Sequence, residues 1–240
     1  MSATSVALIV GAGPGLGSAL ARCFARHGMS VAVARRDAAA LSPLVKSLGP
    51  ASRAYACDAT DERAVQQLFS AVAGDLGTPQ LVVHNAGGYV RKGVLETTVE
   101  EFETCWRNAC LGGFLVGREA ARAMFAAEPA GRHRGTVIFT GATASLRGGA
   151  RFHNLAVGKF GLRALAQSMA REFQPHGIHV AHVIIDGQIE AERPGRSVAE
   201  RGEDAVLSPD AIAESYFQLH QQPPSAWTLE MDLRPYVEKF

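Results

Sequence analysis

The sequence predicts an α/β fold, a doubly wound Rossmann-type parallel sheet with helices on both faces. Short apolar, β-rich runs alternate with longer helical patterns along the chain, which is the arrangement of repeated βαβ units. The first of these runs, VALIV at 6–10, has the continuous apolar character of a strand buried on both faces. Because crossovers between parallel strands are right-handed, the helices are expected to cover both faces of one sheet.

The predicted elements follow one another without a break. A glycine-rich segment at 11–17 comes directly after the first strand, and the helix that follows it ends at Gly28, a typical C-terminal cap. The last predicted helix begins with the cap sequence Ser-Pro-Asp. The remaining strands are expected at 30–34, 54–57, 80–83, 136–140, 178–185 and 227–231, and the helices at 38–48, 62–73, 99–127, 153–174 and 208–220.

Residues 1–240 are expected to form a single domain, since no linker, repeat or low-complexity segment divides the chain. The irregular piece is 186–207, which carries charges, Gly and Pro and little periodicity. A linker would have this composition too, but its place after an interior strand favours a substrate lid beside a site at the strand ends. The alternating pattern around 227–231 predicts an edge strand or a strand on an oligomer face.

Composition excludes several classes of protein. The formal net charge is +1, whereas a nucleic-acid-binding face needs clustered excess Lys and Arg. No apolar run approaches the roughly 18 residues that span a bilayer, and the N-terminus has no secretory signal pattern. The four cysteines show no paired metal-ligand spacing. We therefore expect no metal, no disulfide and a reducing, cytoplasmic location.

The segment GAGPGLG at 11–17 lies between a strand and a helix, and this context makes a glycine motif informative. Glycines let the backbone turn sharply and approach a pyrophosphate, while the N-terminus of the helix offers free N–H groups and positive dipole charge. A tight strand–helix turn is the alternative. The placement favours dinucleotide binding.

The end of the second strand distinguishes between the two nicotinamide dinucleotides. Folds specific for NAD place an acidic residue there to bind the ribose 2′-hydroxyl, whereas this chain has Arg35 and Arg36. A guanidinium fork suits a 2′-phosphate. Asp37 comes one residue too late and is expected to begin the next helix. NADP is therefore expected in preference to NAD.

Three motifs, in order and at matching spacing, resemble those of the short-chain dehydrogenase/reductase family over at least residues 5–190. The glycine pattern GxxxGxG is met at 11–17, the Asp that contacts adenine after the third strand corresponds to Asp58, and NNAG after the fourth strand corresponds to HNAG at 84–87. His84, in place of the first Asn, is expected to be a packed or hydrogen-bonded loop residue. The resemblance implies cofactor contacts from Gly11, Gly13, Pro14, Gly15, Leu16, Gly17, Arg35, Asp58, Ala59, Asn85, Ala86, Gly87, Lys159 and Ile189.

The resemblance also places the reacting groups. In the family a Tyr exchanges a proton with the substrate, a Lys four residues later lowers the pKa of that Tyr and binds the nicotinamide ribose, a Ser orients the substrate oxygen, and an Asn holds a water. The Lys position is kept as Lys159, while the Tyr, Ser and Asn positions are occupied by Leu155, Ala142 and Ala109. Asn108 lies one residue away, about 100° around the helix.

Other polar groups in the same stretch could substitute for the missing ones. His153 can titrate near neutral pH and Asn154 can bind a substrate oxygen, so these two residues join Lys159 as candidate catalytic residues. A structural or solvent-exposed role is the alternative for each. Further substitutes nearby are Thr140, Thr143 and Ser145.

The C-terminal segment from Ser208 resembles that of an atypical subgroup of the family, which has an apolar residue in place of the catalytic Tyr and keeps the Lys. Two functions follow. One is an NADP-dependent oxidoreductase that takes its proton from water, the substrate or a local group, for which an activated C=C or C=N bond is better suited than a ketone. The other is a non-catalytic NADP-binding protein that signals the state of the cofactor. Pairing of the helices 99–127 and 153–174 in the family implies a homodimer or homotetramer.

Overall fold

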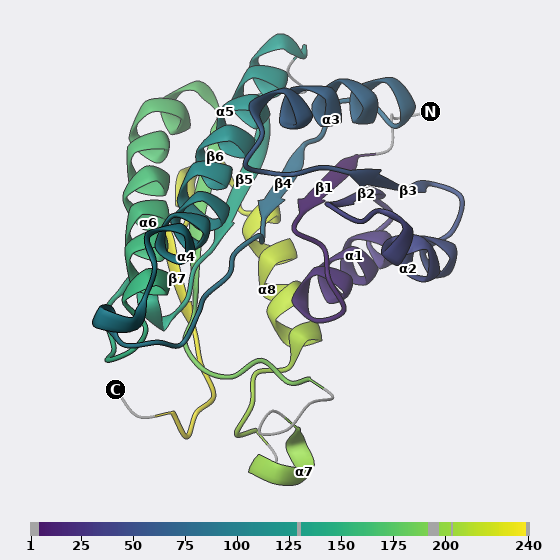
Figure 1. Ribbon diagram of the computed structural model, residues 1–240. Helices are drawn as coiled ribbons and strands as arrows, with labels where there is room; N and C mark the ends of the chain where they lie inside the picture. Colours follow the sequence, from purple (N-terminus) through teal and green to yellow (C-terminus); the bar gives the residue numbers. More distant parts are fainter. Residues whose placement is uncertain (1–4, 129–130, 192–196, 203, 239–240) are drawn as a thin grey trace.

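One parallel sheet runs through the molecule. The structure is a computed structural model and describes residues 5–128, 131–191, 197–202 and 204–238. Within these residues the sheet has seven strands in the order β3-β2-β1-β4-β5-β6-β7 (Figure 1). All neighbouring strands are parallel. The strands are β1 (Val6–Val10), β2 (Ser30–Arg35), β3 (Ser52–Ala56), β4 (Leu81–His84), β5 (Gly135–Thr140), β6 (Ile178–Ile185) and β7 (Glu230–Leu233).

Helices cover both faces of the sheet, as Figure 1 shows. One layer contains α1 (Leu16–Arg26), α2 (Ser42–Leu48) and α8 (Pro209–Gln221). The other contains α3 (Glu62–Asp75), α5 (Gly112–Ala126) and α6 (His153–Phe173), with α4 (Val99–Trp106) packed against α6. The short helix α7 (Val198–Arg201) lies apart from both layers, at the bottom of the view.

Strand β1 shows why the sequence gives this architecture. Its side chains point alternately to the two faces, so Val6, Leu8 and Val10 join the core beneath α3, α5 and α6, while Ala7 and Ile9 join the core beneath α1 and α8. All five residues are buried, and two-sided burial requires the uninterrupted apolar run of the sequence. The predicted doubly wound α/β fold is confirmed.

The long helix predicted at 99–127 contains an irregular turn. Between α4 and α5 the chain forms a π-helical turn, η3 (Arg107–Leu111). Directly after this turn the helix approaches its neighbours closely, because a Cβ on Gly113 would lie 2.3 Å from Leu162 in α6, and one on Gly112 would lie 3.3 Å from His84. Hydrophobic periodicity averages over such a turn and does not reveal it.

The last strand begins three residues later than the sequence pattern indicates. It was predicted at 227–231, but β7 covers Glu230–Leu233. The ring of Trp227 stacks on His179 with centroids 5.0 Å apart, and its Nε1 donates to the carbonyl oxygen of Gln222 at 3.1 Å. Trp227 therefore packs across the start of β6 instead of joining the ladder. The strand does lie at the edge of the sheet, as predicted.

The two ends of the segment 186–207, predicted to be a lid, are joined to each other by backbone contacts. Ile189 forms an isolated parallel bridge with Leu207, and the N–H of Leu207 donates to the carbonyl oxygen of Gln188 at 2.8 Å. Residues 192–196 and 203 of the predicted lid are outside the described residues. In the described part of the chain, no helix has the length and apolar character needed to cross a membrane.

The closest backbone approach that shapes the site joins the ends of β1 and β4. Gly11 has φ +89°, and a Cβ placed there would lie 2.4 Å from the backbone nitrogen of Ala86. Only glycine tolerates both the dihedral angle and the contact. The loops that follow these two strands are thereby held against each other.

We expect Gly11→Ala to lower the free energy of unfolding by at least about 2 kcal/mol, because the methyl group forces the two loops apart and the backbone is strained. Gly13→Ala is the matched control, since a Cβ there meets no atom within 4 Å. Urea unfolding followed by circular dichroism measures both. Equal losses in the two variants would show that the Gly11–Ala86 contact is not a constraint.

Candidate functional site

Two cavities lie side by side at the carboxyl ends of the strands and share one lining residue, Asn85. Each has a volume of about 430 Å³. The first is built by the loops after β1, β2, β3 and β4, and the second by the loops after β4, β5 and β6 together with the start of α6. Ligands of open parallel sheets bind at this edge. We name them the dinucleotide cavity and the substrate cavity.

The glycine loop forms the floor of the dinucleotide cavity. The backbone N–H groups of Gly11 and Ala12 donate to the carbonyl oxygen of Ala34 at 2.9 and 3.1 Å, which fixes the loop to the end of β2. Gly17 packs α1 closely on the loop, because a Cβ there would lie 2.7 Å from the Cα of Ala12. Above Gly13 and Gly15 there is open space. The loop residues 11–14, directly before α1, therefore line a cradle that fits a pyrophosphate.

The ends of β2 and β3 bring charged groups to the same cavity. Arg35, Arg36 and Asp58 line it. The carboxylate of Asp58 accepts hydrogen bonds from the N–H and the hydroxyl of Thr60 at 2.9 and 2.8 Å, and the backbone bond is the main reason that the pKa of Asp58 is lowered. The carboxylate of Asp37 accepts from the N–H groups at the start of the next turn. Asp37 also lines the cavity, with its carboxylate bound to these backbone N–H groups.

The remaining predicted cofactor contacts come from the β4 loop and from Ile189. Asn85 donates from Nδ2 to the carbonyl oxygen of Gly11 at 3.0 Å, so its side chain also holds the β1 and β4 loops together. Ala59, Ala86 and Gly87 line the dinucleotide cavity, along with Pro14. The substrate cavity is lined by Leu16 and Ile189. All the predicted cofactor contacts except Gly15, Gly17 and Lys159 are lining residues of one cavity or the other.

Lys159 is buried between the two cavities, with a side chain that reaches from α6 to the ends of β4 and β5. Its Nζ donates to the carbonyl oxygen of Thr140 at 2.7 Å and lies 3.4 Å from the position of a Cβ on Gly87. The residue is 6% exposed, and burial lowers the pKa of the ammonium group to about 8. The Thr140 side chain is held in turn by the hydroxyl of Tyr216, which donates to its Oγ1 at 3.0 Å. The Lys159 ammonium group therefore lies beside residues of both cavities, Thr140 of the one and Gly87 of the other.

Leu155 and Ala142 both line the substrate cavity. The aromatic part of the wall consists of Tyr89 and Phe152, whose rings are stacked with centroids 5.7 Å apart. Phe152 directly precedes α6, and the Arg91 guanidinium lies 5.4 Å from the centroid of its ring. Among the described residues that line this cavity, the titratable side chains are Tyr89 and Arg147. At positions 155 and 142, where the family has its Tyr and Ser, the side chains that face the cavity therefore contain carbon atoms and no polar group.

His153 and Asn154, predicted as candidate catalytic residues, lie outside both cavity linings. The His153 ring stacks on Phe102 of α4 with centroids 6.4 Å apart. Asn154 is buried, and its Nδ2 donates to the carbonyl oxygen of Val90 at 2.7 Å. Both side chains fasten the start of α6 to the segment around α4. Their placement supports the structural alternative.

The π turn η3 separates the roles of Ala109 and Asn108. Ala109 is buried, and its carbonyl oxygen lies 3.2 Å from Nε2 of His84. His84 is the last residue of β4, not a loop residue as predicted, and burial lowers its pKa to about 3. Asn108 lines the dinucleotide cavity, with its Nδ2 3.7 Å from the position of a Cβ on Gly88. An amide is thus present at this edge although the aligned position holds Ala.

The sequence reasoning missed the polar groups around the substrate cavity that come from outside the motifs. Tyr89 and Arg147 are two of them. Gln188 is another. Asp186 lies behind the lining; it is 3% exposed, accepts a hydrogen bond from the hydroxyl of Thr143, and pairs with Arg234 at 3.1 Å. A signal was available, because Asp186 directly follows the buried run 178–185, and residues at the carboxyl end of a parallel strand face ligands.

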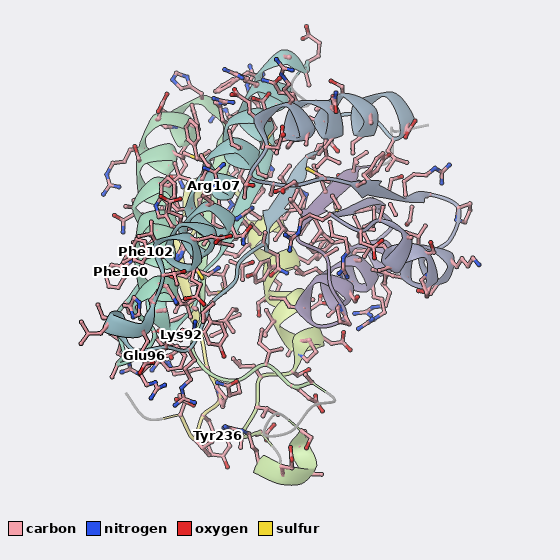
Figure 2. The ribbon with its side chains drawn as sticks, viewed as in Figure 1. Lys92, Glu96, Phe102, Arg107, Phe160 and Tyr236 are labelled. Atoms are coloured by element: carbon pink, nitrogen blue, oxygen red, sulfur yellow. The ribbon has the colours of Figure 1, made fainter. Side chains whose placement is uncertain are left out.

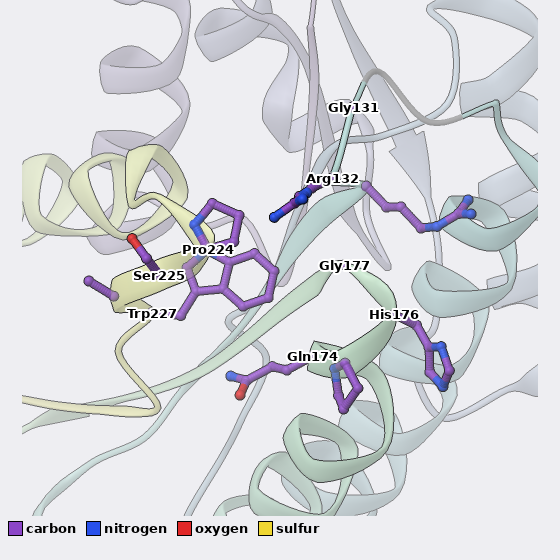
Figure 3. Close-up of a pocket in the computed structure, with 11 residues that line it drawn as sticks. Gly131, Arg132, Gln174, His176, Gly177, Pro224, Ser225 and Trp227 are labelled. Atoms are coloured by element: carbon purple, nitrogen blue, oxygen red, sulfur yellow. The ribbon is translucent and has the colours of Figure 1, made fainter.

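A separate cavity of about 640 Å³ opens at the opposite edge of the sheet (Figure 3). Its lining comes from the segments that precede β5, β6 and β7, with the Trp227 indole on one side and Arg132 and Gln174 beside it. The amino ends of the strands are not where open parallel sheets bind their ligands. Its greater size does not make it the functional site.

Solved structures of short-chain dehydrogenases share the fold of this chain. A crystal structure of a short-chain dehydrogenase from Rhodopseudomonas palustris is 41% identical, with a TM-score of 0.81 over 97% of this chain and 99% of that one. A metagenomic short-chain oxidoreductase in complex with NADP is 26% identical, with a TM-score of 0.82 over 99% and 100%.

Among curated proteins, a short-chain dehydrogenase/reductase of Armillaria gallica is 34% identical over 180 residues, which is 73% of this chain and 67% of that protein. Two other curated relatives are longer, and the match covers 52% and 63% of their lengths. The family model described as short chain dehydrogenase matches residues 5–193. The chain therefore belongs to the short-chain dehydrogenase/reductase family.

Proposed function

We propose that this chain binds NADP(H) and catalyses a hydride transfer to a substrate that needs no proton from a Tyr. The observation that carries the proposal is the pair of adjoining cavities that share Asn85, with the glycine loop in one of them and buried Lys159 between them. Bound NADPH would supply the hydride. The chain's own residues bind the cofactor, orient its ribose and enclose the reacting carbon in a largely apolar cavity.

The preference for NADP over NAD rests on the end of β2. Arg35, Arg36 and Asp37 line the dinucleotide cavity there, and the Asp37 carboxylate accepts hydrogen bonds from backbone N–H groups of the next turn. A guanidinium can form charge-assisted, bidentate hydrogen bonds with a 2′-phosphate. The NADP bound to the metagenomic relative agrees with this preference.

Leu155 and Ala142 limit the reaction that the substrate cavity can support. Neither residue can donate a proton to an alkoxide that forms during reduction of a ketone. An activated C=C or C=N bond is better suited. Hydride addition to an activated C=C bond gives an enolate that can take a proton from water, and a protonated imine already carries the proton of the amine product. A non-catalytic NADP-binding protein is the second proposal, and it is favoured by this same absence of an acid at positions 142 and 155.

We expect Arg35→Ala to raise the dissociation constant of NADPH about 10- to 100-fold, because a charge-assisted hydrogen bond to the 2′-phosphate is lost. The dissociation constant of NADH should change less than about twofold. Fluorescence titration of the nicotinamide measures both, and Arg53→Ala, on exposed β3, serves as the control. Equal weakening of NADPH and NADH would contradict the assignment of the 2′-phosphate.

Turnover distinguishes the two proposed functions. Purified protein is incubated with NADPH and a panel of ketones, enals and imines, and the loss of NADPH absorbance is followed. We expect turnover with an enal or imine, and a decrease of about 100-fold in Lys159→Ala because the nicotinamide ribose is no longer held in place. Lys46→Ala, an exposed lysine of α2, is the control. Tight binding of NADPH without turnover of any compound would favour the non-catalytic protein.

We further propose that the chain forms a homodimer or homotetramer through the outer faces of α4, α5 and α6. Large apolar side chains are exposed there, namely Val99, Trp106, Phe114, Val157 and Phe160. Figure 2 labels Phe102 and Phe160 on this side of the molecule. Exposed apolar surface of this kind marks protein contacts.

Phe160→Lys should weaken the association by at least about 2 kcal/mol, roughly 30-fold, because a charge is placed in an apolar contact. Tyr236→Lys is a matched control, since Tyr236 is 82% exposed and lies away from these helices. Size-exclusion chromatography with light scattering over a dilution series gives the oligomeric state. A wild-type monomer at all concentrations would contradict the proposal.

A further inference from the structure

A buried carboxylate stands directly behind the wall of the substrate cavity. Asp186 follows the last residue of β6 and is 3% exposed. Its backbone N–H donates to the carbonyl oxygen of Leu233 at 2.8 Å, and its Oδ2 lies 3.1 Å from Nη2 of Arg234. Arg234 also pairs with Asp232. These three charged groups therefore carry one net negative charge, and the carboxylate has a fixed orientation.

The other carboxylate oxygen of Asp186 accepts the hydroxyl proton of Thr143, which lines the substrate cavity. A hydroxyl has one proton to donate and two lone pairs to accept with. Because the Thr143 proton is directed at the carboxylate, the oxygen can only accept hydrogen bonds from a ligand in the cavity. A ketone oxygen needs a donor, so it gains nothing from Thr143. A ligand N–H is the matching partner.

The nearby charge also selects the ligand. The group formed by Asp186, Asp232 and Arg234 lies behind the wall, and its net negative charge favours a cation in contact with Thr143. Arg147 is the one cationic lining residue among those described, and it is exposed to solvent, where its repulsion is weakened. Two further cations lie behind the lining, where Lys159 donates to the carbonyl oxygen of Thr140 and Arg91 lies against the Phe152 ring. The apolar part of the wall includes Tyr89, Phe152 and Leu155, and the neutral side chains of Asn85, Thr140 and Gln188 add polar groups without charge. This environment suits a compact cation with an apolar body.

We propose that the substrate cavity takes a protonated imine, whose N–H donates a hydrogen bond to Thr143 Oγ1 while Asp186 holds the Thr143 hydroxyl in the accepting orientation. The inference rests on the proposed hydride-transfer function and names its substrate class. Thr143 contacts the substrate, and Asp186 is a positioning residue that acts through it.

The reaction balances without an acid in the cavity. The imine carbon gains a hydride from NADPH, forming one C–H bond, and the π electron pair of the C=N bond becomes the lone pair of the nitrogen. The iminium ion becomes a neutral amine and NADPH becomes NADP⁺. No proton is consumed, so Leu155 and Ala142 are compatible with this step.

Binding tests the proposal independently of turnover. The probe is protonated tetrahydroisoquinoline, which resembles the iminium ion of dihydroisoquinoline in shape and charge and cannot be reduced by NADPH. Isochroman has the same bicyclic shape, with oxygen in place of the N–H group. Calorimetric titration into the NADPH-saturated protein should show that the amine binds at least about tenfold more tightly than isochroman.

Three variants assign the preference to the proposed pair. Thr143→Val keeps the shape but removes the acceptor, and should reduce the preference for the amine to less than about twofold. Thr143→Ser keeps the hydroxyl and should keep the preference. Asp186→Asn should reduce it as well, because the neutral amide lacks the charge; a purely structural loss would weaken the amine and isochroman alike. If Asp186→Asn does not fold, the comparison of Thr143→Val with Thr143→Ser still shows whether the Thr143 hydroxyl causes the preference for the amine.

Turnover gives a second readout. The reductions of dihydroisoquinoline and of the N-methyl-dihydroisoquinolinium ion are compared, because both ions are cationic and only the first has an N–H. Thr143→Val should lower kcat/KM for dihydroisoquinoline at least about tenfold more than for the N-methyl ion.

Two results would overturn the inference while NADPH binding stays intact, namely equal affinity of wild type for the amine and isochroman, or a preference that Thr143→Val leaves unchanged. Loss of the proposed function itself has a different signature. In that case the protein fails to bind NADPH in the fluorescence titration, or binds it tightly and reduces no ketone, enal or imine.

Discussion

The site depends on the contact between the backbones that follow β1 and β4. Gly11 and Ala86 approach so closely that no side chain fits between them, and the Asn85 amide bonds across the same junction. The two strands are neighbours in the sheet although far apart in sequence. Right-handed crossovers on opposite faces leave a crevice at this point, between the elements on the two sides. The dinucleotide cavity and the substrate cavity lie on either side of this junction and share Asn85.

A second anchor organises the substrate end. Thr140, at the end of β5, is bound through its carbonyl oxygen by Lys159 from one helix layer and through its hydroxyl by Tyr216 from the other. The strand end is therefore fixed from both faces of the sheet. Lys159 remains in place with no Tyr at position 155, since its nitrogen is held by the backbone. The position of Lys159 thus depends on the scaffold and not on the side chain at position 155.

The sequence sufficed to predict the sheet, its flanking helices and most of the dinucleotide cavity, because each depends on local patterns such as VALIV at 6–10 or the glycines at 11–17. It did not reveal that Asn154 bonds to Val90 or that Trp227 packs on His179, since these contacts join distant segments. Asp186 was overlooked because it belongs to no motif, and its role depends on Thr143 and Arg234, which the fold brings together.

The π turn at 107–111 has a consequence for comparing this chain with its relatives. Such a turn accommodates one more residue than an α-helical turn without displacing the ends of the helix. Position-by-position matching is therefore valid before and after the turn and ambiguous within it, where a shift of one residue carries a side chain to a different face. Asn108, in the dinucleotide cavity, and Ala109, beneath His84, occupy those two faces. An amide that is missing at one position can thus be supplied by the adjacent residue. Which polar groups reach the site therefore depends on the three-dimensional structure of the turn and not on residue numbering.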